Sequence, residues 1–193
     1  STPTAGTSNV RLGVNAGDSI TSGGNYNVLV GDEAGTALTT GDDNVFVGAF
    51  AGDAIDTAVS NTAVGSESLS TDTKGQHSVA IGYRALKTAN QTSALNSYNV
   101  GVGSQAGGAV TTGIRNTLIG GLAGDALTDA DKNVAIGYLA LSGDTLGSTS
   151  VAVGMGTLQN QNFTSATNSF NTAVGHEAGN DITTGTNNTF VGG

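Results

Sequence analysis

A short hydrophobic motif recurs along the whole chain, with the pattern Asn-x-x-aliphatic-Gly and with Ser in place of Asn twice. Its glycines are Gly13, Gly31, Gly48, Gly65, Gly82, Gly103, Gly120, Gly137, Gly154, Gly175 and Gly192. Successive glycines lie 17 residues apart, except for one spacing of 18 and two of 21. A near-constant period of this length is typical of repeat proteins, in which each repeat packs against its neighbours.

Positions inside the motif alternate with a period of two, which indicates a short strand. The residue before the glycine is Val or Ile in ten repeats and Leu12 in the first, and β-branched side chains favour strands. We expect this aliphatic column to face inward and the central residue of each motif to face outward. The sequence therefore predicts an all-β fold, a parallel β-solenoid (β-roll) of about ten 17-residue coils.

Asn opens nine of the eleven motifs, as at Asn44 and Asn116. Stacked Asn side chains can hydrogen-bond from coil to coil, and Asn tolerates the left-handed backbone of tight turns. We therefore expect a ladder of Asn side chains along one corner of the solenoid.

One position in each coil exchanges between two residue types. Four residues after the motif glycine the chain has Gly in six coils and Leu in four. The Gly is followed three residues later by an aliphatic residue, as in Gly35 and Leu38, whereas the Leu is followed by Asp, Ala or Gln, as in Leu141 and Asp144. Because protein interiors are close-packed, this exchange predicts one aliphatic filler per coil, supplied from either of two positions.

A longer period lies above the coil. Gly31 and Gly103 are 72 residues apart, so three coils of 17 and one of 21 form a higher unit, and the longer coils carry matching insertions at residues 90–98 and 162–170. Loops held at intervals on a rigid scaffold are natural contact sites. The candidate contact residues are Asn90, Gln91, Leu95, Tyr98, Asn162, Phe163, Thr167 and Phe170.

The central residue of the motif is uncharged in every repeat but the first, which has Arg11. If this column faces outward it forms an apolar surface stripe, and such stripes usually mark interfaces. The candidate interface residues are Leu29, Phe46, Leu118 and Phe190. The alternative is that a small coil turns this residue inward.

Three of the motifs resemble the head repeats of YadA-like trimeric autotransporter adhesins: Asn-Thr-Ala-Val-Gly at 61–65 and 171–175, and Ser-Val-Ala-Ile-Gly at 78–82. A longer segment such as 133–141 is similar to the repeats of phage tail-fibre proteins, of the kind that precede endosialidase-type chaperone domains. The resemblance covers residues 9–193. It implies a parallel β-roll, three chains side by side, and a role in display or attachment.

Composition narrows the classes of function. The 193 residues include 31 Gly and no Cys or Trp, and only 11% are charged, but 37% are hydrophobic, which argues against disorder. The formal net charge of −9 disfavours nucleic acid, whose phosphates require Lys and Arg. No apolar run approaches the roughly 20 residues of a membrane span. We expect no nucleic-acid partner and no membrane insertion.

No group of residues suggests catalysis or a cofactor. His77 and His176 lie in different coils without metal-ligand spacing, and the acidic pair Asp42–Asp43 lacks a calcium-loop pattern. The recurring Gly-x-x-Ala-Gly is architectural, because a nucleotide site would occur once. We therefore expect no enzyme activity, no cofactor and no metal site. Triplets at Asn90 and Asn162 match the glycosylation acceptor pattern, which arises easily in Asn- and Thr-rich repeats.

The sequence thus predicts a structural fibre or adhesin segment, a rigid spacer that displays contact loops at the cell surface, outside the cell or on a virion. It divides into a lead-in at residues 1–8 and a solenoid domain at 9–193. The expected partners are further copies of the chain, as a homotrimer or homopolymer, and a cell-surface glycan or protein receptor. The alternative function is a subunit of a secreted self-assembling filament. A dedicated glycan-binding module would require an aromatic platform, for which Tyr83 and Tyr138 are the candidates.

Overall fold

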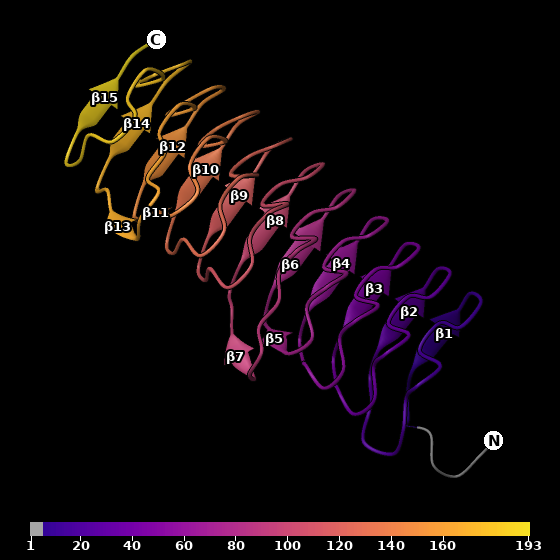
Figure 1. Cartoon of the computed structure of the whole chain (residues 1–193). Coiled ribbons are helices and arrows are strands. Elements are labelled where there is room, and N and C mark those ends of the chain that lie inside the picture. The colour runs from indigo at the N-terminus through magenta and orange to yellow at the C-terminus, as the bar shows by residue number, and fades with distance from the viewer. Residues whose placement is uncertain (1–5) are drawn as a thin grey trace.

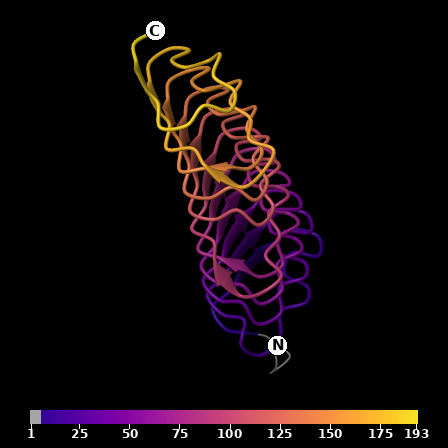
Figure 2. The ribbon, with the colours of Figure 1, turned by 60° about the vertical axis from the view of Figure 1, so that its left-hand side comes forward.

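The computed structural model describes residues 6–193, and these form one continuous parallel β-solenoid that contains no helix (Figure 1). The coils stack along a common axis into a rod, and Figure 2 shows them as nested loops around that axis. The predicted all-β class and parallel solenoid are confirmed. Most of the predicted lead-in, residues 1–8, lies outside the described residues.

Each coil contributes one strand to a single 11-stranded parallel sheet. In order, its strands are β1 (Val10–Leu12), β2 (Val28–Val30), β3 (Val45–Val47), β4 (Thr62–Val64), β6 (Val79–Ile81), β8 (Val100–Val102), β9 (Thr117–Ile119), β10 (Val134–Ile136), β12 (Val151–Val153), β14 (Thr172–Val174) and β15 (Thr189–Val191). Every motif pairs in register with the next, as Val28 does with Val45. Two further parallel pairs join β5 (Gly75–Gln76) to β7 (Leu95–Asn96) and β11 (Gly147–Ser148) to β13 (Thr167–Asn168).

The motif glycines stack on one another. Gly31 has a φ of 137°, and a Cβ atom placed on it would lie 2.5 Å from the carbonyl oxygen of Gly48. The same Cβ on Gly103 would lie 2.5 Å from the carbonyl oxygen of Gly120. Both the backbone conformation and the close approach of the next coil therefore require glycine.

The predicted Asn ladder is confirmed. The backbone N–H of Asn44 donates to Oδ1 of Asn27 in the preceding coil (2.9 Å), and its Nδ2 donates to the carbonyl oxygen of Ala58 in its own coil (2.9 Å). Asn116 repeats this arrangement with Asn99 (3.0 Å) and Ala130 (2.7 Å). These Asn side chains are buried. Each one therefore links two coils and also closes its own coil.

The strands face the opposite way from the prediction. The central residue of the motif points into the coil: Leu29, Phe46 and Leu118 are fully buried, and Phe190 packs partly buried against the core. The flanking β-branched residues are half-buried or exposed instead. The predicted interface stripe at Leu29, Phe46, Leu118 and Phe190 is therefore wrong, and the alternative orientation is correct. A three-residue strand can turn either its centre or both flanks inward, and in this narrow coil the interior takes one side chain from the strand, that of the central residue.

The Gly/Leu exchange follows from this orientation. A Cβ on Gly52 would lie 2.8 Å from three ring atoms of Phe46, the centre of its own motif. The four Leu residues at this place are fully buried with φ near 50°, and they occur only in coils whose motif centre is Ala, as Leu141 does with Ala135. Both predicted filler positions do lie in the core, but the rule of one filler per coil is incomplete. The motif centre is a third contributor to the same space.

Candidate functional site

The two predicted contact loops leave the rod at equivalent places. Strand β7 lies within residues 90–98 and pairs with β5 of the preceding coil, and β13 lies within residues 162–170 and pairs with β11. Figure 1 shows β7 and β13 away from the main sheet, along the same edge of the rod. The insertions thus extend individual coils sideways without interrupting the stacking of the main strands.

Six of the eight predicted contact residues are accessible. The exposed ones are Asn90, Leu95, Tyr98, Asn162 and Phe170, and Thr167 is half-buried. Gln91 and Phe163 are only 5% exposed, so the prediction is wrong for these two. They line the coil interior at the point where each insertion begins.

A buried carboxylate of the preceding coil holds the first part of each insertion. Oδ1 of Asp72 accepts the backbone N–H groups of Gln91 (3.0 Å) and Gly75 (2.9 Å). Oδ1 of Asp144 accepts those of Phe163 (3.0 Å) and Gly147 (3.0 Å). The sequence carries a signal for this anchor, because Asp stands at the filler position only in the two coils that precede an insertion.

Aromatic residues end both insertions. Tyr98 and Phe170 adopt left-handed backbone conformations, with φ of 48° and 50°. The Tyr98 ring lies 5.3 Å from the ring of His77 between centroids, and Nδ2 of Asn96 donates to the Tyr98 hydroxyl oxygen (3.2 Å). Each insertion therefore presents an exposed aromatic side chain beside polar groups.

The outward side of the main sheet is a second candidate surface. Each of its eleven strands turns its first and third residues outward, and none of these residues is charged. This outer face consists of Val10, Leu12, Val28, Val30, Val45, Val47, Thr62, Val64, Val79, Ile81, Val100, Val102, Thr117, Ile119, Val134, Ile136, Val151, Val153, Thr172, Val174, Thr189 and Val191. At about 4.8 Å per strand and about 10 Å across, its area is roughly 500 Å². Apolar patches of about 300–600 Å² are the largest that a typical monomer exposes, and they are often functional.

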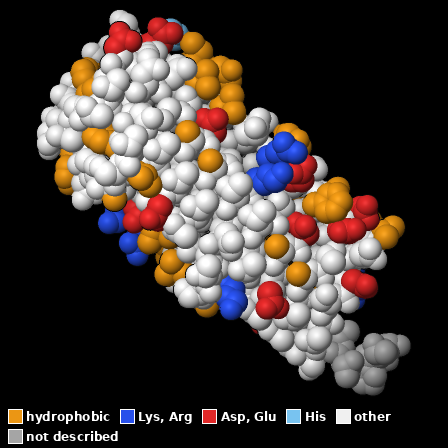
Figure 3. Space-filling model, in the orientation of Figure 1, with side chains coloured by type: hydrophobic (Ala, Val, Ile, Leu, Met, Phe, Trp, Pro, Cys, Tyr) orange, Lys and Arg blue, Asp and Glu red, His pale blue; other side chains and the backbone are white. Residues whose placement is uncertain are grey.

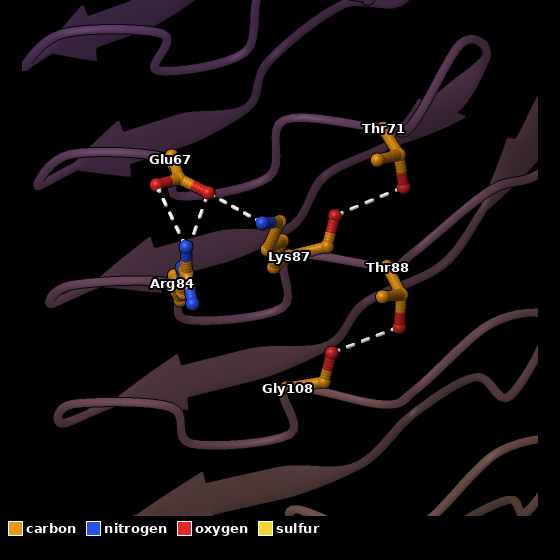
Figure 4. Close-up of polar contacts among 6 residues, drawn as sticks. All are labelled: Glu67, Thr71, Arg84, Lys87, Thr88 and Gly108. Carbon is orange, nitrogen blue, oxygen red and sulfur yellow. Dashed lines mark hydrogen bonds and ion pairs between the residues drawn. The ribbon is translucent and has the colours of Figure 1, made fainter.

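A charged cluster joins two coils in the middle of the rod (Figure 4). Glu67 accepts hydrogen bonds from Nε and Nη2 of Arg84 (3.1 Å each) and from Lys87. The Lys87 hydrogen bond and then that of Arg84 lower the pKa of Glu67, and Glu67 in turn raises the pKa of Arg84. Because one carboxylate engages both cations, this cluster is a contact between coils and not an open basic site.

Other charges on the rod are similarly dispersed. On the face shown in Figure 3, Lys and Arg side chains lie beside Asp and Glu side chains and form no field of a single sign. Asp53 and Asp125 are half-buried, and burial raises the pKa of both carboxyl groups. Oδ1 of each accepts no hydrogen bond from any residue in the described part of the chain.

Residues 6–193 contain no candidate metal site and no candidate membrane-spanning helix. No group of three or more His, Asp or Glu side chains there could hold a metal ion, and no helix there is long and apolar enough to cross a bilayer. No protein-family model, curated protein or solved structure matches the chain. The fold therefore defines the class of this protein, a parallel β-solenoid.

Proposed function

We propose that this chain is a structural segment of a fibre or adhesin, a rigid spacer outside the cell or on a virion that has no enzyme activity. The observation that carries the proposal is the outer face, a long surface of Val, Ile, Leu and Thr without a single charge. A surface of this kind is costly to leave in water, at about 25 cal/mol per Å² of apolar area. It is well suited to cover the same surface of another copy.

The outer face fits a closed assembly of three chains. All of its residues lie on one side of each coil and continue along the whole sheet, so three rods can bury their outer faces together around a shared axis. Closed cyclic symmetry leaves no apolar edge exposed, which prevents open-ended growth. Each partner of a standard interface buries about 800 Å², of which the outer face supplies roughly 500 Å².

The insertions are the proposed attachment points. The 72-residue unit places residues 90–98 and 162–170 four coils apart, or roughly 19 Å along the rod at about 4.8 Å per strand. Their exposed aromatic and amide groups, as at Tyr98 and Asn162, suit a glycan or a protein receptor on a cell surface. In this arrangement the sheet assembles the fibre and the loops contact the target.

The oligomeric state tests the proposal. Sedimentation equilibrium should show three chains for the wild type. The double variant Val102→Asp and Ile119→Asp should be monomeric with an unchanged β-sheet circular dichroism spectrum, because burying an unpaired charge costs several kcal/mol. Ser104→Asp is the matched control, since Ser104 lies in the exposed turn after the same strand, and it should remain assembled. A monomeric wild type would refute self-association through this face, and growth without limit would favour a secreted filament.

A further inference from the structure

Two equivalent buried polar sites lie beneath the insertions, and they differ at two buried residues, because the first has Ala89 in place of Gln161 and Gln91 in place of Phe163. In the second site, Nε2 of Gln161 donates to Oδ2 of Asp144 (2.6 Å) and to Oγ of Ser150 (2.8 Å). Its Oε1 accepts a hydrogen bond from Nδ2 of Asn171 (2.8 Å). Ser150 also bonds Oγ of Ser169 (2.5 Å), at the end of the insertion. One amide thus completes a fully buried network.

The first site keeps the Asp, Ser and Asn residues but has no amide in the place of Gln161, since the buried amide of Gln91 donates to the carbonyl oxygen of Thr112 instead (3.0 Å). Asp72, Ser78, Ser97 and Asn99 occupy the places of Asp144, Ser150, Ser169 and Asn171, each 72 residues earlier, whereas Ala89 stands in place of Gln161. All of these residues are buried, and Ala89 is 4% exposed. Ala89 has four fewer non-hydrogen side-chain atoms than Gln161, a difference in volume of about two water molecules at ~30 Å³ each.

Two oxygen atoms of the first site have no partner among the described residues, namely Oδ2 of Asp72 and Oγ of Ser97. They converge on one point. A Cβ atom placed on Gly75 would lie 2.2 Å from the former and 2.8 Å from the latter. Asn99 donates through Nδ2 to the carbonyl oxygen of Gly113 (2.7 Å), and its second N–H corresponds to the one that Asn171 directs to Gln161. The site therefore offers acceptors and one spare donor, which is the set that the Gln161 amide satisfies.

We propose that the first site is a binding site for buried water, which replaces the amide of Gln161. A water molecule can donate to Asp72 and to a serine hydroxyl while it accepts from Asn99, and buried waters typically make about three hydrogen bonds of this kind. A metal cation suits the site poorly for two reasons. The second N–H of Asn99 is directed into the site, and its partial positive charge would repel a cation. Cations such as Ca²⁺ also require six to eight oxygen ligands. A buried polar atom without a partner is destabilising, so an occupied site is favoured over a dry one.

The bound water fastens the first insertion to the rod at both of its ends. Asp72 already holds the beginning of the loop through the N–H of Gln91, and Ser97 belongs to the end of the same loop. Water that bridges Asp72 and Ser97 connects the two ends of the first insertion, as Gln161 and Ser150 connect Asp144 to Ser169 at the second. The two loops are therefore fixed by equivalent networks, one completed by solvent and one by protein.

A high-resolution crystal structure tests the assignment directly. We expect ordered water within hydrogen-bonding distance of both Oδ2 of Asp72 and Oγ of Ser97. An empty site, a bound cation with short contacts to several oxygens, or a direct bond from Ser97 to Asp72 would each overturn the proposal.

Thermal unfolding of matched variants separates a polar water site from a simple cavity. Ala89→Gln should displace the water with the amide found in the second site and raise Tm by about 2–4 °C, the shift that corresponds to about 1 kcal/mol for a chain of this size. Ala89→Leu fills the same space without a donor and should lower Tm. The converse variant Gln161→Ala should lower Tm and show new ordered water in its crystal structure. If Ala89→Leu stabilised the protein as much as Ala89→Gln, the site would be an apolar void.

Discussion

At the residue scale, polar side chains specify the coil as much as aliphatic ones. Asn27 and Asn44 are fully buried and bond between coils, and Asp72 and Asp144 are fully buried where each insertion starts. Buried polar groups stabilise a fold only when their partners are in place. These groups therefore favour the one backbone path that pairs them over compact alternatives that would leave them unpaired.

Asp125 gives a pH prediction at this scale. Burial raises the pKa of its carboxyl group in the folded state, so the folded state holds the proton more tightly than the unfolded state does. Ionisation of Asp125 therefore costs stability at neutral pH, and the cost disappears as the pH falls through the raised pKa. Asp125→Asn should raise Tm by about 1–2 °C at neutral pH, a modest effect because the group is partly solvated. The gain should shrink on acidification.

A variant with the same charge change provides the control. Asp32 is exposed, so Asp32→Asn should leave Tm nearly unchanged at either pH. Equal effects of the two substitutions would mean that net charge, and not the burial of Asp125, governs the difference.

At the scale of the element, the sequence predicts the strand but not its orientation. The period-two pattern at Val45–Phe46–Val47 locates a strand correctly, and it is compatible with either face inward. The orientation depends on the space inside the coil, which Phe46 shares with the backbone of Gly52 in a later part of the same coil. Likewise, Gln91 and Phe163 belong to polar, loop-like segments, and their burial depends on bonds to aspartates in another coil. Contacts between coils of this kind cannot be read from the hydrophobic pattern of the insertion itself.

The Gly/Leu exchange can be tested by converting one coil type into the other. Phe46→Ala should cost about 3–5 kcal/mol by leaving a cavity. Gly52→Leu alone should destabilise the coil, because its Cβ would lie 2.8 Å from the Phe46 ring. The double variant recreates the pair Ala63 and Leu69 but keeps Ile55 where that coil has Asp72, so it should recover part of the loss. A double-mutant cycle in thermal unfolding measures the coupling, and simple additivity would contradict the shared-space account.

At the scale of the whole molecule, coils contact only their neighbours, and stability is a sum of coil and interface terms. A defect in the middle of the rod should therefore separate two parts that unfold independently. Gly103→Val is such a defect, because Gly103 has a φ of 135° and its Cβ would lie 2.5 Å from the carbonyl oxygen of Gly120. We expect the single unfolding transition to divide into two, and hydrogen exchange to accelerate first around β8 and β9.

Gly121→Ala is the control for that experiment. Its backbone is not left-handed, and its Cβ would meet the Tyr138 ring at an ordinary 3.5 Å and the carbonyl oxygen of Ser104 at 4.0 Å. This variant should unfold in one step, close to the wild type. One cooperative transition in Gly103→Val as well would show that the rod folds as a single unit.

The in-register pairing of every motif with the next has a consequence for how such a gene changes length. Duplication or loss of a 17-residue unit by unequal recombination shifts the chain along the axis by one step and returns each backbone group to an equivalent partner. The joint is constrained by the side chains, since a Cβ on Gly35 would contact Leu29 of its own coil and Phe46 of the next. Recombination that keeps neighbouring coils together therefore preserves packing. Recombination that places a coil with Leu at the position of Gly35 beside coils with bulky motif centres does not, because that Leu would clash with those centres. The number of coils therefore sets the length of the rod.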